Sequence, residues 1–295
     1  MFDATIACGA SAFKSGVVSG SLNPEWNEEF TLYTPPDHLA RIFGADLEAG
    51  LDPEGRPSWN VPPTRSILAV TAERTAEGAD DDGGAGGVGD DGGAGGVGDG
   101  PVVRLHRTMG RFRWGLVPSW ADDPAIGGRM FNARAETVAT KPSFRSAYVR
   151  RRAAVVADGF YEWHTGPDRT KQPYYFTRAD GAPLALAGLW EVWSPAGGDA
   201  EQAPLRSCTV ITTEAGPDLA AVHHRTPVVL EADSLDEWLD PGNTDKGELA
   251  ALLAAPAAGT LVGRRVDRAV GNVRNDGASL IETVPDDDGG GPPVG

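Results

Sequence analysis

Short runs of apolar and β-branched residues recur along most of the chain, separated by polar segments that contain Gly or Pro. The runs that predict strands are 66–71, 102–105, 111–117, 153–156, 174–177, 184–190, 208–213 and 228–230. Stretches with helical periodicity are fewer and shorter: 36–43, 136–141, 219–222, 235–239 and 246–254. Many strands with sparse helices predict an α+β fold around a mainly antiparallel, barrel-like sheet.

Residues 78–100 interrupt this pattern with a low-complexity segment. The sequence D-D-G-G-A-G-G-V-G occupies 81–89 and repeats at 90–98. So few apolar side chains cannot offset the entropy lost on ordering, which predicts a disordered insertion. A calcium-binding β-roll also uses Gly/Asp nonapeptides, but it needs several repeats in a row. The segment lies between two predicted strands, so we expect it to lengthen a hairpin loop. The Asp/Gly/Pro-rich end of the chain, 283–295, predicts a disordered tail.

Charge is unevenly distributed along the chain. The whole sequence has 26 basic and 42 acidic residues, a net charge of −16, which argues against a nucleic-acid partner. Residues 101–178, however, hold 14 Lys and Arg against 6 Asp and Glu. This basic middle is compatible with an anionic partner, and equally with an unevenly charged solvated surface.

Composition excludes several other classes of protein. Cys8 and Cys208 are too few for a disulfide framework or a four-thiolate zinc site. Cys208 lies in a predicted strand, which favours a buried structural thiol. No run approaches 18 apolar residues, and the N-terminus lacks a basic start followed by an apolar run. We therefore expect a cytoplasmic protein without a membrane partner.

Two motifs offer side chains suited to binding DNA. In R-F-R-W-G-L-V-P-S-W (111–120), Trp114 and Pro118 could contact bases, or could belong to an ordinary Trp-rich core. In F-N-A-R-A-E-T (131–137), the amide of Asn132 could orient a carbonyl or an amine, or could cap the following helix. Arg134, and Arg145 of K-P-S-F-R (141–145), supply guanidinium groups that bind phosphate bidentately.

Two further motifs offer groups for proton transfer. In A-D-G-F-Y-E-W (157–163), Glu162 stands among aromatic residues that include Trp163. Apolar surroundings would raise its pKa toward neutrality, whereas an exposed Glu on a half-buried strand would do no chemistry. In V-H-H-R-T-P-V (222–228), His223 could exchange protons near pH 7. The adjacent pair His223–His224 lacks the spacing and further ligands of a metal site, so we expect no metal.

Taken in this order, the motifs resemble the SOS response-associated peptidase (SRAP) family, sensors of abasic sites in single-stranded DNA. The resemblance runs from Tyr33 to Glu282. It is also carried by P-S-W-N-V-P-P-T (57–64), K-Q-P-Y-Y (171–175), A-G-L-W-E (187–191), T-V-I-T-T-E-A (209–215) and V-R-N-D-G (273–277). It implies a monomer that needs no cofactor and binds single-stranded DNA with abasic sites in the cytoplasm, at the nucleoid.

The resemblance also implies a mechanism and a role for each candidate residue. In the family, removal of the initiator Met exposes an N-terminal cysteine, whose amine and thiol capture the aldehyde of the abasic sugar as a thiazolidine. Asn132 would orient the amine and the sugar, Glu162 would move protons, and His223 would assist opening of the sugar ring. The groups expected along the DNA are Arg134 and Arg145 on phosphates, and Trp114, Pro118 and Trp163 in the groove.

The N-terminus differs from the family pattern. The family begins Met-Cys-Gly, whereas this chain begins Met1-Phe2-Asp3, and its nearest cysteine is Cys8. Residues 3–32 resemble two strands of a C2 domain, which predicts a division into a C2-like fragment (1–32), an SRAP domain (33–282) and the tail. Two other functions stay open: a single-stranded DNA binder that has lost its nucleophile, and a C2-type calcium- or lipid-binding module.

Overall fold

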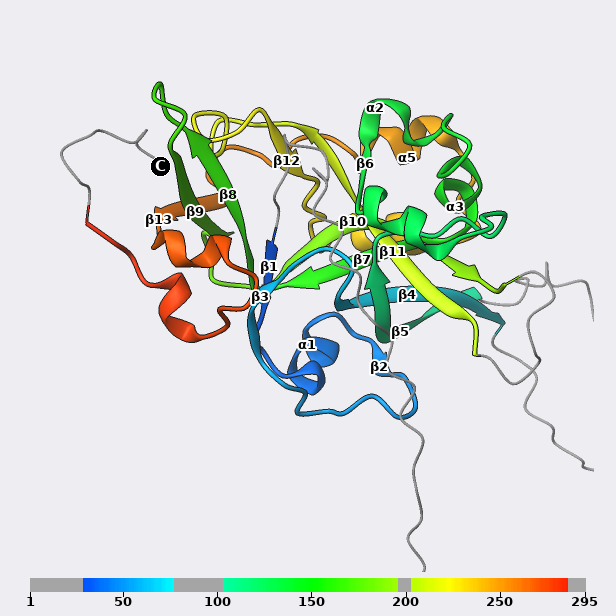
Figure 1. Cartoon of the computed structure of the whole chain (residues 1–295). Coiled ribbons are helices and arrows are strands. Elements are labelled where there is room, and N and C mark those ends of the chain that lie inside the picture. Colours follow the sequence, from blue (N-terminus) through cyan, green and yellow to red (C-terminus); the bar gives the residue numbers. More distant parts are fainter. Residues whose placement is uncertain (1–28, 77–102, 196–202, 286–295) are drawn as a thin grey trace, which may run out of the picture.

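A computed structural model describes residues 29–76, 103–195 and 203–285 (Figure 1). Cys8, residues 1–28 of the C2-like fragment, the insertion at 78–100 and residues 286–295 of the expected tail lie outside the described residues.

The smaller of two sheets has five strands, in the order β13–β9–β8–β1–β3, and all its neighbours are antiparallel. The strands are β1 (Glu29–Leu32), β3 (Ser58–Val61), β8 (Gly159–Thr165), β9 (Lys171–Arg178) and β13 (Leu261–Arg265). Alternation places Phe160 of β8 toward one core and Tyr161 toward another. This sheet therefore has apolar contacts on both faces.

The larger sheet follows the order β12–β11–β10–β7–β4–β5–β2, with β6 also paired to β11. Its strands are β2 (Asp46–Leu47), β4 (Ser66–Ala76), β5 (Val103–Trp114), β6 (Asn132–Arg134), β7 (Arg152–Ala157), β10 (Leu184–Trp193), β11 (Leu205–Glu214) and β12 (Arg225–Pro227). A parallel pairing of β5 with β11 closes a ring through β4, β7 and β10. The predicted α+β fold with a barrel-like, mainly antiparallel sheet is confirmed.

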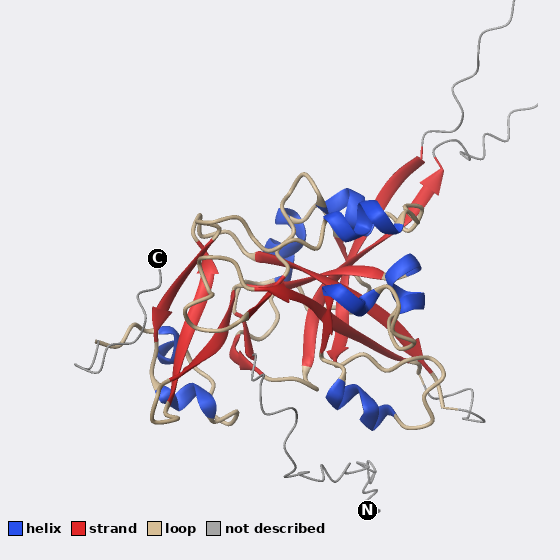
Figure 2. Ribbon diagram, turned by 90° about the horizontal axis from the view of Figure 1, so that it is seen from above, coloured by secondary structure: helices blue, strands red, loops and turns tan. Residues whose placement is uncertain are grey.

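Helices are short and lie around the strands (Figure 2). They are α1 (Pro36–Ile42), α2 (Ala135–Val138), α3 (Arg145–Arg150), α4 (Leu235–Leu239) and α5 (Lys246–Ala251), with 3-10 turns at Pro124–Arg129, Arg268–Gly271 and Ala278–Ile281. Proline at the first position begins α1, and the Asp245 side chain accepts hydrogen bonds from backbone N–H groups that begin α5. The stretch 219–222, predicted as a helix, forms turns instead.

Two large apolar clusters lie on opposite faces of the barrel strands. Successive residues of β7 alternate between them: Ala153 and Val155 face one cluster, Ala154 and Val156 the other. The first cluster joins both sheets through Phe30 of β1, Trp114 of β5 and Phe160 of β8. The second covers the opposite face with side chains of the helices, Trp238 of α4 among them. The first cluster is therefore a core that both sheets share.

Strand β1 changes the expected position of the domain boundary. It pairs with β8 and β3, and Phe30 is 1 % exposed and stacks on Trp114 with ring centroids 4.3 Å apart. Residues 29–32, which the sequence assigned to the C2-like fragment, are thus part of the smaller sheet. The proposed division at residue 33 falls after the first described strand of this fold.

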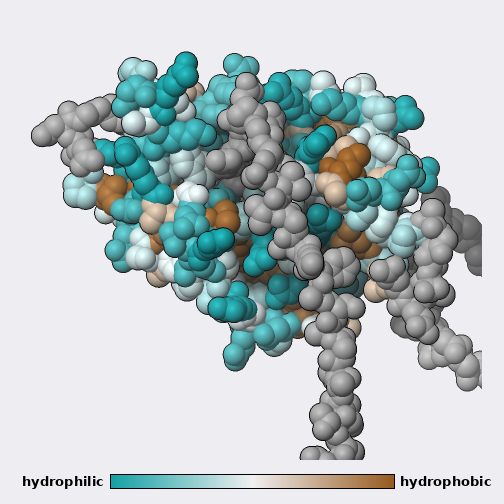
Figure 3. Space-filling model, in the orientation of Figure 1, coloured by the Kyte–Doolittle hydropathy of each residue, from teal (hydrophilic) through white to brown (hydrophobic). Residues whose placement is uncertain are grey.

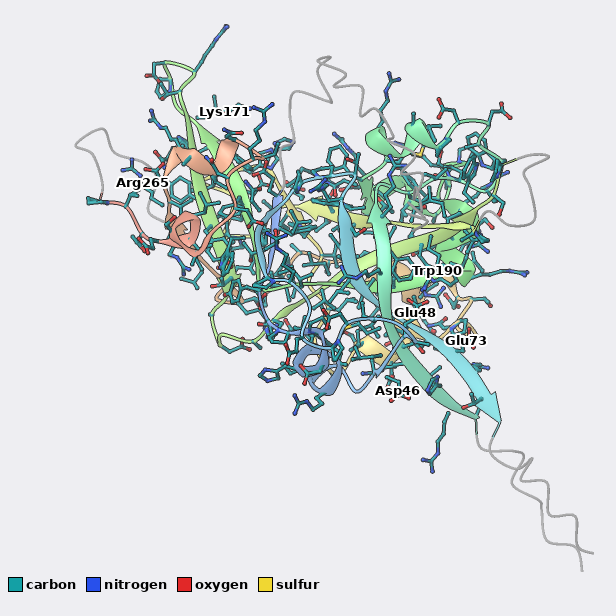
Figure 4. All side chains as sticks on the ribbon, turned by 60° about the horizontal axis from the view of Figure 1, so that its bottom comes forward. Asp46, Glu48, Glu73, Lys171, Trp190 and Arg265 are labelled. Carbon is teal, nitrogen blue, oxygen red and sulfur yellow. The ribbon has the colours of Figure 1, made fainter. Side chains whose placement is uncertain are left out.

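The visible surface is mostly hydrophilic, with apolar residues in scattered patches (Figure 3). Figure 4 shows Asp46, Glu48 and Glu73 near β2 and the β4–β5 pair, and Lys171 and Arg265 at the other side of the molecule. None of the helices in the described part of the chain has the length and apolar composition needed to span a bilayer.

Candidate functional site

Glu162 is a buried carboxylate at the junction of the two sheets. It lies on β8, opposite Tyr174 of β9, and is 2 % exposed. It follows Phe160 on the same face of the strand, next to the core that joins the sheets. Its Oε1 atom is 3.7 Å from Nδ1 of His223. The alternative of an exposed Glu on a half-buried strand is therefore wrong.

His223 reaches Glu162 from the larger sheet, in the segment just before β12. Its side chain is 12 % exposed, and its ring lies 4.4 Å from that of His224. Nδ1 is 3.2 Å from the backbone nitrogen of Arg225 and 3.3 Å from the backbone oxygen of the same residue. A neutral imidazole can accept a hydrogen bond from that N–H, and a protonated one can donate to that carbonyl. The main chain thus supports both protonation states.

The carboxylate and the imidazole form a pair suited to proton transfer. Their separation of 3.7 Å is longer than a hydrogen bond, but a small shift would connect them. A buried acid next to a histidine can take a proton from one reacting atom and return it to another. Such a pair suits addition to a carbonyl and elimination of water from the product.

Asn132 is placed by the pairing of β6 with β11. The chain leaves β5 at Trp114, continues through the segment 115–131, and joins β11 again with Asn132 opposite Val210. A hydrogen bond from the Leu116 N–H to the Met130 carbonyl joins the two ends of this loop. Asn132 does not cap the next helix, because the N-cap of α2 is Arg134. β6 and β12, the strand after His223, meet β11 at the same residue, Thr212.

The two arginines expected to bind phosphate are both exposed. Arg134 ends β6, close in sequence to Asn132, and lies opposite Thr212 of β11. Arg145 begins α3. The structure therefore places Arg134 on the same short strand as Asn132, and Arg145 on a separate helix.

The expected groove contacts divide into buried and partly exposed residues. Trp114 is 0 % exposed, and its indole N–H donates to the Phe131 carbonyl at 2.9 Å. Pro118 is also buried. A DNA contact by either side chain does not agree with these positions; Trp114 packs in the core between the sheets, as the alternative interpretation had it. Trp163 on β8 is partly exposed and keeps a surface for a ligand.

Arg225 and Glu136 also belong to the candidate site, although neither was a candidate from the sequence. Arg225 is 7 % exposed, and its guanidinium contacts the carboxylate of Glu136 at 2.5 and 3.0 Å. Their presence inside H-H-R-T-P-V and N-A-R-A-E-T was the only available signal. Nothing in the spacing showed that the two motifs would meet.

The described residues contain no group of three or more His, Cys, Asp or Glu side chains that could hold a metal ion. Cys208 is fully buried on β11, and burial raises the pKa of its thiol far above the usual range. A thiol in this state is a poor nucleophile. Cys8, the other cysteine, lies outside the described residues.

Comparison with known proteins agrees with the fold and the motifs. The model of the SOS response associated peptidase (SRAP) family matches residues 29–273. The chain belongs to the SRAP family. Two relatives come from Bacillus subtilis (strain 168). Abasic site processing protein YoaM is 36 % identical over 255 residues, covering 86 % of this chain and 96 % of the relative. Abasic site processing protein YoqW is 35 % identical over 256 residues, covering 86 % and 98 %.

A solved structure supports the same fold for this SRAP chain. The crystal structure of a protein from Bacteroides thetaiotaomicron superposes with a TM-score of 0.65 and 19 % identity, covering 87 % of this chain and 99 % of that one. The family match begins at residue 29, the first residue of β1. The family match therefore includes β1.

Proposed function

We propose that this chain binds abasic sites in single-stranded DNA and performs carbonyl chemistry on the opened sugar. The observation that carries the proposal is the contact between buried Glu162 and His223, which joins two motifs of the SRAP pattern at 3.7 Å. An abasic sugar in its open form presents an aldehyde, and addition to an aldehyde needs a proton shuttle. The relatives named as abasic site processing proteins support this choice of substrate.

In this proposal each residue has the role that the family resemblance implies for it. Glu162 moves protons between the attacking amine and the carbinol oxygen that leaves as water. His223 protonates or deprotonates the sugar oxygens as the ring opens. Asn132, on the strand beside β11, orients the amine and the sugar through its amide. Arg134, Arg145 and Trp163, all at least partly exposed, contact the DNA strand.

Covalent capture requires an N-terminal cysteine. Cleavage ahead of Cys8 would supply one, with a free amine and a thiol on the same residue. Its condensation with the aldehyde forms one C–N bond and one C–S bond and releases one water, which gives a thiazolidine. Without such a residue, the same site binds abasic DNA and forms no stable adduct, which is the second candidate function.

A denaturing gel with intact-mass analysis tests the proposal. The chain is mixed with a single strand that holds one abasic site, and with the same strand undamaged. We expect a heat-stable adduct with the abasic strand alone, and peptide mapping identifies the attached residue. Preferential binding of the abasic strand without an adduct supports the second candidate. Equal binding of both strands, with no adduct, contradicts the proposed function.

Glu162→Gln tests the proton shuttle with little change in shape. We expect adduct formation to slow by about a hundredfold, within the usual range for general acid–base catalysis, while DNA affinity stays within about twofold. Glu191→Gln is the matched control, because Glu191 is also buried, at 7 % exposure, and its carboxylate contacts Arg151. An equal effect of both variants would contradict the role of Glu162.

A further inference from the structure

Arg225 is a buried guanidinium with partners on two different elements. Besides Glu136, it donates to the Thr212 carbonyl at 2.6 Å and lies 3.4 Å from the Thr212 hydroxyl. Thr212 is 2 % exposed, and the Arg225 side chain is 8 % exposed. A bidentate, charge-assisted contact of this kind fixes the direction of a guanidinium as well as its position.

The contact between Arg225 and Glu136 spans β11, the strand that lies between their elements. Arg225 begins β12, and Glu136 belongs to α2, which directly follows β6. Both β12 and β6 pair with β11, at Thr212. The Arg225 side chain therefore extends past Thr212 and joins the element after Asn132 to the element after His223, across 89 positions of sequence.

The main chain of the same arginine contacts the imidazole. The N–H of Arg225 points to Nδ1 of His223 at 3.2 Å, and its carbonyl oxygen is 3.3 Å from the same atom. An imidazole that accepts at Nδ1 carries its proton on Nε2, and one that donates from Nδ1 does so to the carbonyl. In either state, fixing the Arg225 backbone holds Nδ1 in place and so fixes the direction in which the other nitrogen can act.

Glu136 keeps its charge at neutral pH. The hydrogen bond from Arg225 lowers the pKa of the Glu136 carboxyl, and the nearby charges of Arg225 and Arg134 lower it further. The carboxylate is thus a permanent partner for the guanidinium. Because the Glu136 side chain is 49 % exposed, a contribution to stability alone would be small.

We propose that Arg225 is a positioning residue for His223 and that Glu136 is the anchor which holds it. This inference rests on the proposed function, in which His223 acts on the sugar. Arg225 sets the imidazole through its main chain, and Glu136 and Thr212 hold the side chain of Arg225 against β11. The same contact fixes the distance between the His223 segment and the strand of Asn132.

The test compares Glu136→Gln with a matched control, Glu231→Gln. Glu231 makes the same bidentate contact with Arg178, at 3.2 and 3.0 Å, and is also 49 % exposed. Two measurements are made on each full-length chain: the nitrogen chemical shifts of the His223 ring by NMR, assigned with a His223→Gln chain, and the rate of reaction with the abasic strand.

In the unsubstituted chain, we expect one set of His223 ring signals, because the Arg225 main chain holds Nδ1 in place. Glu136→Gln should shift the Nδ1 signal and slow the reaction by about tenfold with little change in DNA affinity, because the imidazole loses its fixed direction. Glu136→Asp should restore part of the rate. Glu231→Gln should change neither measurement.

An unchanged His223 signal in Glu136→Gln would overturn the proposal. If undamaged DNA then also binds more tightly, Glu136 only masks the charge of Arg225. If the unsubstituted chain neither prefers nor modifies the abasic strand, the proposed function fails, while the NMR comparison still decides whether Arg225 and Glu136 position His223.

Discussion

Glu29 is a buried acid outside the proposed chemistry. It lies opposite Tyr161 at the start of β1 and is 6 % exposed. Within the described part of the chain, no group hydrogen-bonds to its Oε2 atom. Burial raises the pKa of this carboxyl from 4.5 to about 8. At neutral pH the side chain is therefore mostly protonated, and folding is linked to its protonation.

This linkage predicts a pH-dependent effect of Glu29→Gln. Between pH 4.5 and about 8, the unfolded chain ionises Glu29 and the folded chain does not, so its contribution to stability falls as pH rises through this window. We expect the variant to unfold at nearly the same temperature as the parent at pH 4.5, and several degrees higher at pH 8.5. Thermal unfolding across this range, with exposed Glu73→Gln as control, measures the difference. A difference independent of pH would contradict the assignment.

Arg134→Ala tests a phosphate contact. Arg134 is exposed at the end of β6, and loss of one phosphate contact should weaken binding of all single-stranded DNA alike. In a plot of the logarithm of affinity against the logarithm of salt concentration, the slope should become shallower by about one. Arg41→Ala is the control, since Arg41 is exposed on α1, far from α2 (Figure 1). An unchanged slope would exclude Arg134 from the interface.

At the scale of elements, one buried arginine connects a strand to two helix ends. Arg152 of β7 is 3 % exposed and donates to the carbonyls of Tyr148 and Val149, at the end of α3, both at 2.8 Å. It also donates to the carbonyls of Trp238 at 2.6 Å, Asn243 at 2.9 Å and Asp240. The oxygens of Tyr148, Val149 and Trp238 lie in the last turns of α3 and α4, where carbonyls have no partner within the helix, so Arg152 satisfies them. The Asp240 carbonyl also accepts the Asn243 N–H.

Arg152→Met should therefore be strongly destabilising. The methionine fills much of the space but leaves several buried carbonyls without donors, each at a cost of about 1–3 kcal/mol before relaxation or entry of water. We expect a loss of roughly 3 kcal/mol or more in the free energy of unfolding, measured with urea. Arg74→Met is the comparison, because Arg74 is about half exposed and pairs with Asp240 at the surface. Similar losses for both variants would contradict this account.

The sequence predicted elements best where the pattern was long or had clear ends. The stretch 235–239 is α4, and 36–43 differs from α1 by one residue. The runs 102–105 and 111–117 proved to be one strand, β5, because its first half alternates polar and apolar residues weakly. The three-residue β6 has no period of its own, since pairing with β11 creates it. β1 was missed because its sequence also fits a strand of another fold.

Only part of the candidate site could be predicted from the sequence, because some of its contacts are created by the fold alone. Residue chemistry and the family resemblance selected Glu162 and His223, which the structure brings together. Trp114 was expected to contact DNA, with a position in the core as the alternative, and its burial against Phe30 decides for the core. The contact of Arg225 with Glu136 depends on three strands meeting at Thr212, which no local pattern encodes.

At the scale of the whole molecule, acidic groups exceed basic ones by a wide margin. The net charge of −16 produces repulsion that disfavours a compact chain, whereas residues 101–178 carry the basic groups proposed to meet DNA. Salt screens both effects. It should therefore stabilise the folded chain and weaken its binding to DNA under the same conditions.

The opposite effects of salt on stability and on DNA binding can be measured in one salt titration. From about 0.05 to 0.5 M NaCl the screening length falls from roughly 14 to 4 Å, so we expect most of the rise in melting temperature within this range. Above it the curve should flatten, because few unscreened interactions remain. Affinity for single-stranded DNA should fall continuously over the same interval.

A melting temperature that rises in proportion to salt up to several molar would instead indicate exclusion of ions from the protein surface. One that falls with salt would mean that attractive ion pairs, such as Arg74 with Asp240, outweigh the repulsion among the acidic groups.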